Sequence, residues 1–175
     1  MEKLLAFANR LNVKSSPKWT RALVALRIKA YGFANRHADG FRIWDEALAE
    51  GIVPDSSTQS LILDSCGFVK SKARLVAIMD LLIREQWGGT DVNIWTSAVE
   101  AFCRMGDLES ALNVVHKILP LKGLEPDAKM VGTLITVEPR LNRPLKDKRV
   151  WELVDRVGGQ EVFSAGVRFD EPRPV

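Results

Sequence analysis

The chain has 175 residues, of which 46% are apolar and 27% are charged, and its formal net charge is +3. The length is about that of one ordinary domain, and the balance is typical of a globular rather than a disordered protein. No apolar run approaches the roughly 18 residues of a membrane-spanning helix, so that class is excluded. Cys66 and Cys103 are too few and too far apart for a disulfide framework or a zinc site.

The first predicted element is a short amphipathic helix near the amino terminus. Leu4, Phe7, Ala8 and Leu11 recur at helical spacing, so residues 1–20 are expected to form an N-terminal helix or an orphan half-repeat. A mitochondrial presequence is Arg-rich and poor in acids, and none is visible here.

The middle of the chain is repetitive. Asp55, Asp91 and Asp127 close three segments that end alike, and both intervals are 36 residues long. Superposing the segments gives three columns that are apolar throughout, as expected of an internal repeat. The columns are Ile28, Leu63, Val99 and Ile135; Trp44, Met79, Val115 and Trp151; and Ala47, Leu82, Ile118 and Val154. The predicted units are residues 21–55, 56–91 and 92–127, with a degenerate fourth unit at 128–162.

Each unit is predicted to contain two helices. In the third unit, one helical face is followed by a turn at Gly106, a candidate N-cap at Asp107 and a second helix that Pro120 stops. One such hairpin cannot bury both of its faces, whereas stacked hairpins can. The predicted fold is therefore all-α, an α-solenoid of antiparallel helix-turn-helix repeats with about three clear repeats and the degenerate fourth.

The last part of the chain is less regular. Pro139 and Pro144 are expected to interrupt the first helix of the fourth unit, and a helix carrying Trp151 is expected within residues 145–157. Residues 163–175 are expected to form a loosely held cap or strap.

The clearest unit carries a family resemblance. The segment 93–112, with the endings Gly-Ile-Val-Pro-Asp at 51–55 and Gly-Leu-Glu-Pro-Asp at 123–127, resembles the pentatricopeptide repeat. The tetratricopeptide repeat has a period of 34 and lacks this ending. Units of 36 residues are one residue longer than usual for the family, and the extra residue is expected near the turn after the second helix. The resemblance implies a right-handed superhelix.

The same resemblance implies binding of single-stranded RNA, with about one base read per repeat. A small polar residue early in the first helix would act with the last residue of the repeat. Ser60 with Asp91 and Thr96 with Asp127 would favour guanine, because a hydroxyl donates and accepts while a carboxylate accepts from a base N–H. In the first and fourth units, Ala25 and Gly132 have no side chain that can hydrogen-bond.

Further contacts are carried over from the family in the same way. Side chains packing between bases would come from one position early in each repeat, and Arg104 would approach phosphate. The early positions are Ala22, Ser57, Asn93 and Lys129.

Several of these residues have a structural alternative. The three closing aspartates precede predicted helices, where aspartate is a favoured N-cap. A basic cluster near the C-terminus either grips phosphate or forms a solvated face. Trp44, Trp95 and Trp151 are expected to pack in the core, whereas Trp19 and Trp87 are candidate anchors for a partner. The cluster comprises Arg140, Arg143, Lys146, Lys148 and Arg149.

The function expected from this pattern is not enzymatic. No catalytic, phosphate-binding or dinucleotide-binding motif occurs, so neither catalytic residues nor a metal, cofactor or small-molecule substrate is expected. The resemblance implies a single-stranded RNA-binding module in organellar, specifically mitochondrial, RNA metabolism or translation, within a larger protein or ribonucleoprotein. The alternative is a protein-interaction scaffold in a large assembly such as a mitochondrial ribosome or respiratory complex.

Overall fold

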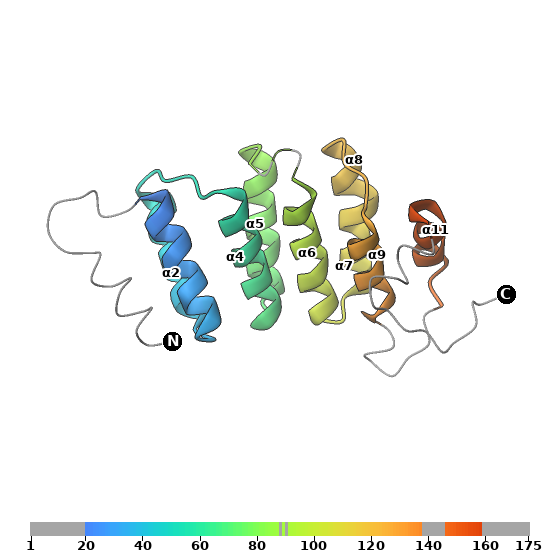
Figure 1. Cartoon of the computed structure of the whole chain (residues 1–175), viewed down its shortest axis with the longest axis horizontal. Coiled ribbons are helices and arrows are strands. Elements are labelled where there is room, and N and C mark those ends of the chain that lie inside the picture. The colour runs from blue at the N-terminus through green and yellow to red at the C-terminus, as the bar shows by residue number, and fades with distance from the viewer. Residues whose placement is uncertain (1–19, 88, 90, 138–145, 159–175) are drawn as a thin grey trace, which may run out of the picture. The chain divides into compact units, whose positions relative to one another are not determined.

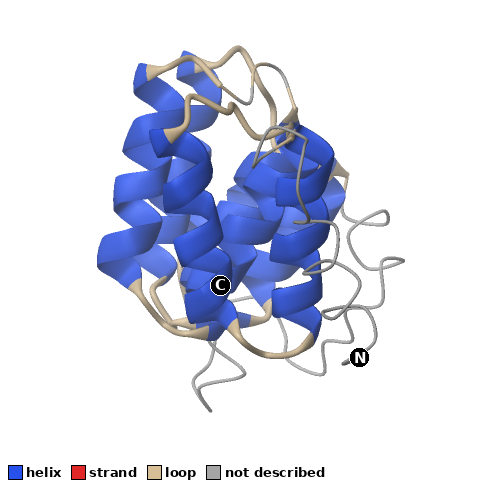
Figure 2. Cartoon of the chain, turned by 90° about the vertical axis from the view of Figure 1, so that its left-hand side faces the viewer, coloured by secondary structure: helices blue, strands red, loops and turns tan. Residues whose placement is uncertain are grey.

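A computed structural model of the chain describes residues 20–87, 89, 91–137 and 146–158. Over these ranges every regular element is a helix and no strand occurs, as Figure 2 shows. The chain divides into two compact units, residues 1–88 and 89–175. A single-domain length yields two units because stacked hairpins bury their core between neighbours rather than around one centre. The elements predicted before Thr20 and within 163–175 lie outside the described residues.

The first unit contains two consecutive helical hairpins. They are α2 (Arg21–Phe33) with α3 (His37–Ala49), and α4 (Ser56–Phe68) with α5 (Lys72–Arg84). The first helices of the two hairpins, α2 and α4, pack side by side, and each also packs against its own second helix (Figure 1). Both hairpin turns pass through a left-handed residue, Asn35 with φ 56° and Lys70 with φ 54°.

The second unit repeats this pattern with one irregular helix. Its first hairpin joins α6 (Val92–Arg104) to a continuous helical run made of α7 (Leu108–Asn113), the π-helical turn η1 (Val114–Ile118) and α8 (Leu119–Leu121). α9 (Ala128–Ile135) then packs against α6, and α11 (Lys148–Val157) packs against α9. Asp107 accepts a hydrogen bond from the backbone N of Ser110 at 3.0 Å, which confirms its predicted role as an N-cap.

The core agrees with the predicted columns at all but two positions. Ile118 and Trp151 are half-buried, whereas the other members of the three columns are buried. The π-helical turn explains Ile118, because a π turn inserts one extra residue into a helix. Ala47 and Leu82 each lie ten residues after the first residue of α3 and α5, but in the third repeat the buried position is Leu119, eleven residues after Leu108.

The extra residue of the 36-residue units is therefore placed differently in the two cases. In the repeat 56–91 the extra residue lengthens the linker after α5. This linker runs from residue 85 to Asp91, whereas the corresponding linker after α3 runs only from 50 to 55. In the repeat 92–127 the extra residue lies inside the second helix, and not in the turn that follows this helix as expected. That helix spans 108–121, one residue longer than the 13 residues of α5.

Cys66 and Cys103 are both buried, and no disulfide joins them. Burial raises the pKa of the Cys66 thiol to about 12, so almost none of the reactive thiolate exists at neutral pH. Across the parts of the chain that the structure describes, no helix is long and apolar enough to cross a membrane. The same ranges contain no cluster of three or more potential metal ligands.

Candidate nucleic-acid interface

The aspartates that close the predicted repeats all cap the helix that follows. Asp55 Oδ1 accepts from the Thr58 N at 2.8 Å, Asp127 Oδ1 from the Met130 N at 2.8 Å, and Asp91 Oδ1 from the Asn93 N at 3.0 Å. Hydrogen bonding from Thr58 holds the pKa of Asp55 below its ordinary value. The capping role predicted as the structural alternative is thus confirmed.

In Asp91 and Asp127, the capping hydrogen bonds use only one of the two carboxylate oxygens. Asp91 uses Oδ1 for both the backbone N and the side-chain Nδ2 of Asn93, each at 3.0 Å, and Asp127 uses Oδ1 for Met130. Among residues with described positions, no donor reaches the second oxygen of either carboxylate. Each of these aspartates can therefore hold its helix terminus and still accept a hydrogen bond from a ligand.

The predicted polar partners of these aspartates differ in accessibility. Thr96 is only 1% exposed, and its hydroxyl donates to the Val92 carbonyl oxygen at 3.0 Å. Ser60 is half-buried on α4. Ser60 lies in the first unit and Asp91 in the second, so their pairing stays a prediction.

The positions predicted to pack between bases share one place in the fold. Ala22, Ser57, Asn93 and Lys129 are the second residues of α2, α4, α6 and α9, and all four are exposed. The repeat therefore presents one accessible side chain in the first turn of every first helix.

Glu100 on α6 is a contact residue that the sequence did not reveal. Its Oε1 lies 3.0 Å from the Lys129 Nζ, and its Oε2 lies 3.3 Å from the Arg104 Nη2. Both cations were predicted to contact RNA, and one carboxylate neutralises part of the charge of each. The spacing of Glu100 and Arg104 at i and i+4 was visible in the sequence, but the approach of Lys129 from α9 was not.

Replacing Glu100 with Gln is expected to remove one ion-pair partner from Lys129 and from Arg104, which leaves more of their charge for phosphate. RNA binding should strengthen about two- to fivefold, the scale of a surface ion pair, and its salt dependence should steepen. Fluorescence anisotropy of a labelled single-stranded RNA over a salt series measures both quantities. Glu46→Gln is the matched control, because it removes the same charge from an exposed i,i+4 pair with Arg42. Equal gains in the two variants would reduce the effect to net charge alone.

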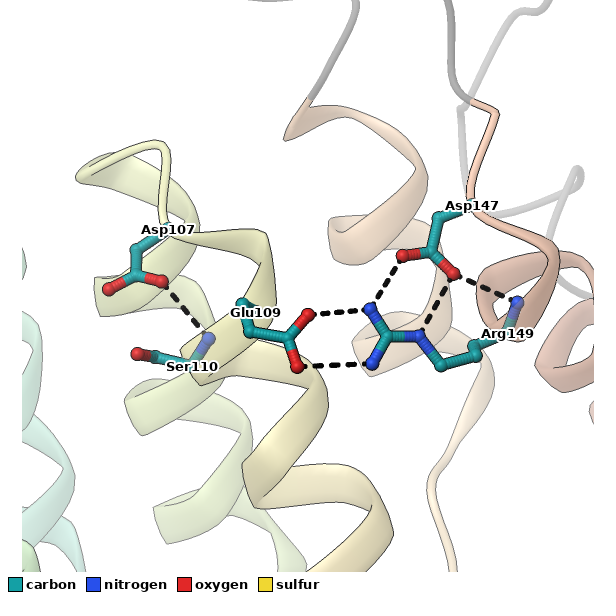
Figure 3. A network of polar contacts seen from close by, with 5 residues as sticks. All are labelled: Asp107, Glu109, Ser110, Asp147 and Arg149. Atoms are coloured by element: carbon teal, nitrogen blue, oxygen red, sulfur yellow. Dashed lines mark hydrogen bonds and ion pairs between the residues drawn. The ribbon is translucent and has the colours of Figure 1, made fainter.

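The basic cluster near the C-terminus contains a cation that is already bound. Arg149 donates to both oxygens of Glu109 at 3.1 and 2.6 Å and also to Asp147, as Figure 3 shows. Hydrogen bonds to Glu109 and then Asp147 raise the pKa of Arg149, and Arg149 in turn lowers the pKa of both carboxyls. Arg149 therefore ties α11 to α7, while Lys146 and Lys148 are exposed. Arg140 and Arg143 lie outside the described residues.

The tryptophans divide between core and periphery. Trp44 and Trp95 are buried, which confirms their predicted packing role, and Lys122 Nζ lies 5.9 Å from the centre of the Trp95 ring. Trp87, a candidate partner anchor, is half-buried in the linker after α5, and Trp19 lies outside the described residues.

The chain was compared with protein-family models, curated proteins and solved structures to identify the class of its fold. No family model matches the chain. A pentatricopeptide repeat-containing protein of Arabidopsis thaliana is 26% identical over 81 residues, which is 46% of this chain and 16% of that protein. Two crystal structures of the pentatricopeptide repeat protein PPR10 with an 18-nt psaJ RNA element, one carrying three cysteine-to-serine substitutions, superpose with a TM-score of 0.75 at 18% identity. They cover 90% of this chain and 23% of PPR10.

The chain is therefore an all-α helical-repeat protein of the solenoid class. Its fold is that of the pentatricopeptide repeat, and the resemblance inferred from the sequence is confirmed by both comparisons. The chain spans less than a quarter of the length of the proteins it matches.

Proposed function

We propose that the chain is a non-catalytic single-stranded RNA-binding module in organellar, specifically mitochondrial, RNA metabolism or translation, acting within a larger protein or ribonucleoprotein. The observation that carries the proposal is the capping geometry of Asp91 and Asp127, which leaves one carboxylate oxygen of each without a donor among the described residues. The fold likeness to PPR10, whose structures contain an RNA element, supports it.

The proposed binding mode assigns three tasks to each repeat. The closing aspartate accepts from a base N–H, the second residue of the next helix packs between neighbouring bases, and a cation contacts phosphate. Between the third and fourth repeats, Asp127 is the closing aspartate, Lys129 is the residue that packs between bases, and Arg104 is the cation. Because Thr96 is buried with its hydroxyl bonded to Val92, Asp127 supplies most of the base contact there.

The number of repeats limits what this module does alone. At about one base per repeat, three or four repeats read only a few bases. Such a short stretch does not single out one transcript, so selectivity requires further binding modules linked to this one, whose combined contacts multiply affinity.

A substitution that keeps the caps but alters the acceptors tests the proposal. Asparagine caps a helix about as well as aspartate, but it replaces one acceptor oxygen with a donor. The double variant Asp91→Asn and Asp127→Asn should therefore retain the melting temperature. We expect its preference for a G-containing single-stranded RNA over the same RNA with adenine to fall about tenfold. Fluorescence anisotropy with the two RNAs gives the ratio of dissociation constants.

Asp55→Asn is the matched control for this experiment. Asp55 caps α4 in the same way, but its predicted partner Ala25 cannot hydrogen-bond, so base preference should not change. Unaltered preference in the double variant would remove the base-reading role. Failure of the parent chain to bind RNA even at low salt would remove the RNA-binding function.

The second candidate function is the protein-interaction scaffold. It is favoured by Leu121, which is 81% exposed at the end of α8, and by Val76, which is 39% exposed on α5. Both lie on second helices, whereas the positions predicted to pack between bases lie on first helices. A parent chain that does not bind RNA at low salt would favour this function.

A further inference from the structure

Asp91 caps α6 with a backbone geometry that differs from the caps at Asp55 and Asp127. At Asp55 and Asp127 the ψ angles are 167° and 169°, and each carboxylate accepts from the backbone N three residues later. At Asp91 the ψ angle is 100°, and the carboxylate accepts from the backbone N of Asn93, only two residues later. This tighter turn places the Asn93 side chain at the cap, where its Nδ2 donates to the same Asp91 oxygen, Oδ1, at 3.0 Å. Two donors of one residue therefore hold one oxygen of Asp91.

Asp147 at the start of α11 has the same geometry with a longer partner. Its ψ angle is 111°, and it accepts from the backbone N of Arg149, also two residues later, at 3.0 Å. The Arg149 side chain reaches both carboxylate oxygens, with Nε 3.1 Å from Oδ1 and Nη2 2.8 Å from Oδ2 (Figure 3). The amide of Asn93 is shorter and donates to Oδ1 of Asp91. The residue type two positions after the aspartate thus decides how many carboxylate oxygens the protein itself uses.

The extra hydrogen bond restricts the Asp91 carboxylate. The torsion that turns an aspartate carboxylate is broad, so a single donor leaves the carboxylate free to rock about it. A second donor on the same oxygen narrows this motion and fixes the direction of Oδ2, which no donor among the described residues reaches. Asn93 is exposed and Asp91 is half-buried, so this pair lies at the surface. An acceptor that is already ordered loses less entropy when a ligand binds, and it therefore binds the ligand more tightly.

We infer that Asn93 is a positioning residue for base recognition, whose side-chain amide holds the Asp91 carboxylate so that Oδ2 accepts from a base N–H. The inference rests on the proposed RNA-binding function and deepens it, because Asn93 acts through Asp91 in addition to its proposed packing between bases. Lys129 occupies the equivalent position beside Asp127, but its Nζ lies 3.0 Å from Glu100. The two base-reading aspartates are therefore held in different ways.

Replacing Asn93 with leucine separates positioning from packing. Leucine has about the same size but no donor, so packing between bases is kept. Asn93→Leu should lower the preference for G-containing over adenine-containing single-stranded RNA about threefold, with little change in affinity for the adenine RNA. The backbone N of residue 93 still donates to Asp91, so the melting temperature should match the parent. Fluorescence anisotropy with the two labelled RNAs measures the ratio of dissociation constants.

Asn93→Arg tests the same point with a change of charge. Arginine two residues after Asp91 should occupy both carboxylate oxygens, as Arg149 does at Asp147. The added charge should strengthen binding of both RNAs, yet the preference for guanine should fall about threefold. Stronger binding together with a lost preference cannot result from damage to the fold.

A double-mutant cycle with Asp91→Asn decides whether Asn93 acts through Asp91. Asp91→Asn alone should lower the preference about threefold, and adding Asn93→Leu should lower it no further. Lys129→Met is the matched control, because Lys129 contacts Glu100 rather than the aspartate beside it. This control should weaken binding of both RNAs equally and leave the preference of the parent.

The outcomes separate the two proposals. An unaltered preference in Asn93→Leu, or effects that multiply in the double variant, would overturn the positioning role while base reading by Asp91 stands. An equal loss of preference in Lys129→Met would assign the effect to packing between bases and also overturn positioning. If Asp91→Asn alone left the preference unchanged, base reading by Asp91 would fall, and the positioning role with it.

Discussion

Trp44→Ala is expected to lower the free energy of unfolding by about 3–5 kcal/mol, a large share of the roughly 5–15 kcal/mol of an ordinary domain. Trp44 is only 1% exposed on α3, so truncation leaves a cavity as well as removing apolar contact. Urea unfolding followed by circular dichroism measures the change, provided that the slope with denaturant is unaltered.

Trp151→Ala is the matched control, because the same residue type occupies the same column of the repeat. Trp151 is half-buried on α11, so we expect a loss nearer about 1 kcal/mol. Similar losses in the two variants would show that the column, rather than the local burial, decides the contribution of each tryptophan.

Deleting Ala77 from α5 is expected to unfold the first unit. Each residue of an α-helix turns the chain by about 100°, so a deletion rotates everything after it out of register. Ile78, Met79 and Leu82 would leave the core, and each such loss costs about 2–5 kcal/mol. Calorimetry should show that the cooperative transition of this unit has disappeared.

Deleting His116 from η1 should have the opposite outcome. The π-helical turn holds one residue more than the α-helix needs, so its loss converts 108–121 into a helix of the same length as α5. Leu119 then falls ten residues after Leu108, the position that Leu82 occupies in α5. We expect stability to change by about 1 kcal/mol or less, within the range of an ordinary surface substitution. Unfolding by this deletion would show that the π turn is required for packing.

Much of the fold was predictable because the same apolar spacing and the same capping aspartate recur in successive repeats, so each repeat supports the prediction made for the others. The caps at Asp55, Asp91, Asp107 and Asp127 follow from aspartate placed before an amphipathic run, and each is observed. Ser71 lies at the N-cap position of α5, a residue type that favours this role, but its side chain makes no capping hydrogen bond. Val69 continues the apolar spacing of α4 in the sequence, but it follows the end of that helix and is 44% exposed.

The candidate interface was less predictable, because its charges pair across helices. The sequence places Lys129 and Arg104 at suitable positions, yet only the packing of α9 on α6 brings Lys129 to Glu100. Arg149 likewise stands in a basic run, but its two carboxylate partners include Glu109, 40 residues earlier in the chain. A count of charges along the chain cannot separate such bound cations from exposed ones.

The periodicity of apolar residues and the recurring aspartates were sufficient to define helical hairpins and their stacking, since both are local signals repeated at a fixed interval. Which side chains are reachable depended on tertiary packing. Burial of Thr96 depends on the packing of neighbouring helices, and the shift from Ile118 to Leu119 follows from the π-helical turn. The physical reason is that helix formation responds to spacing within a few residues, whereas accessibility and ion pairing depend on which helix packs alongside.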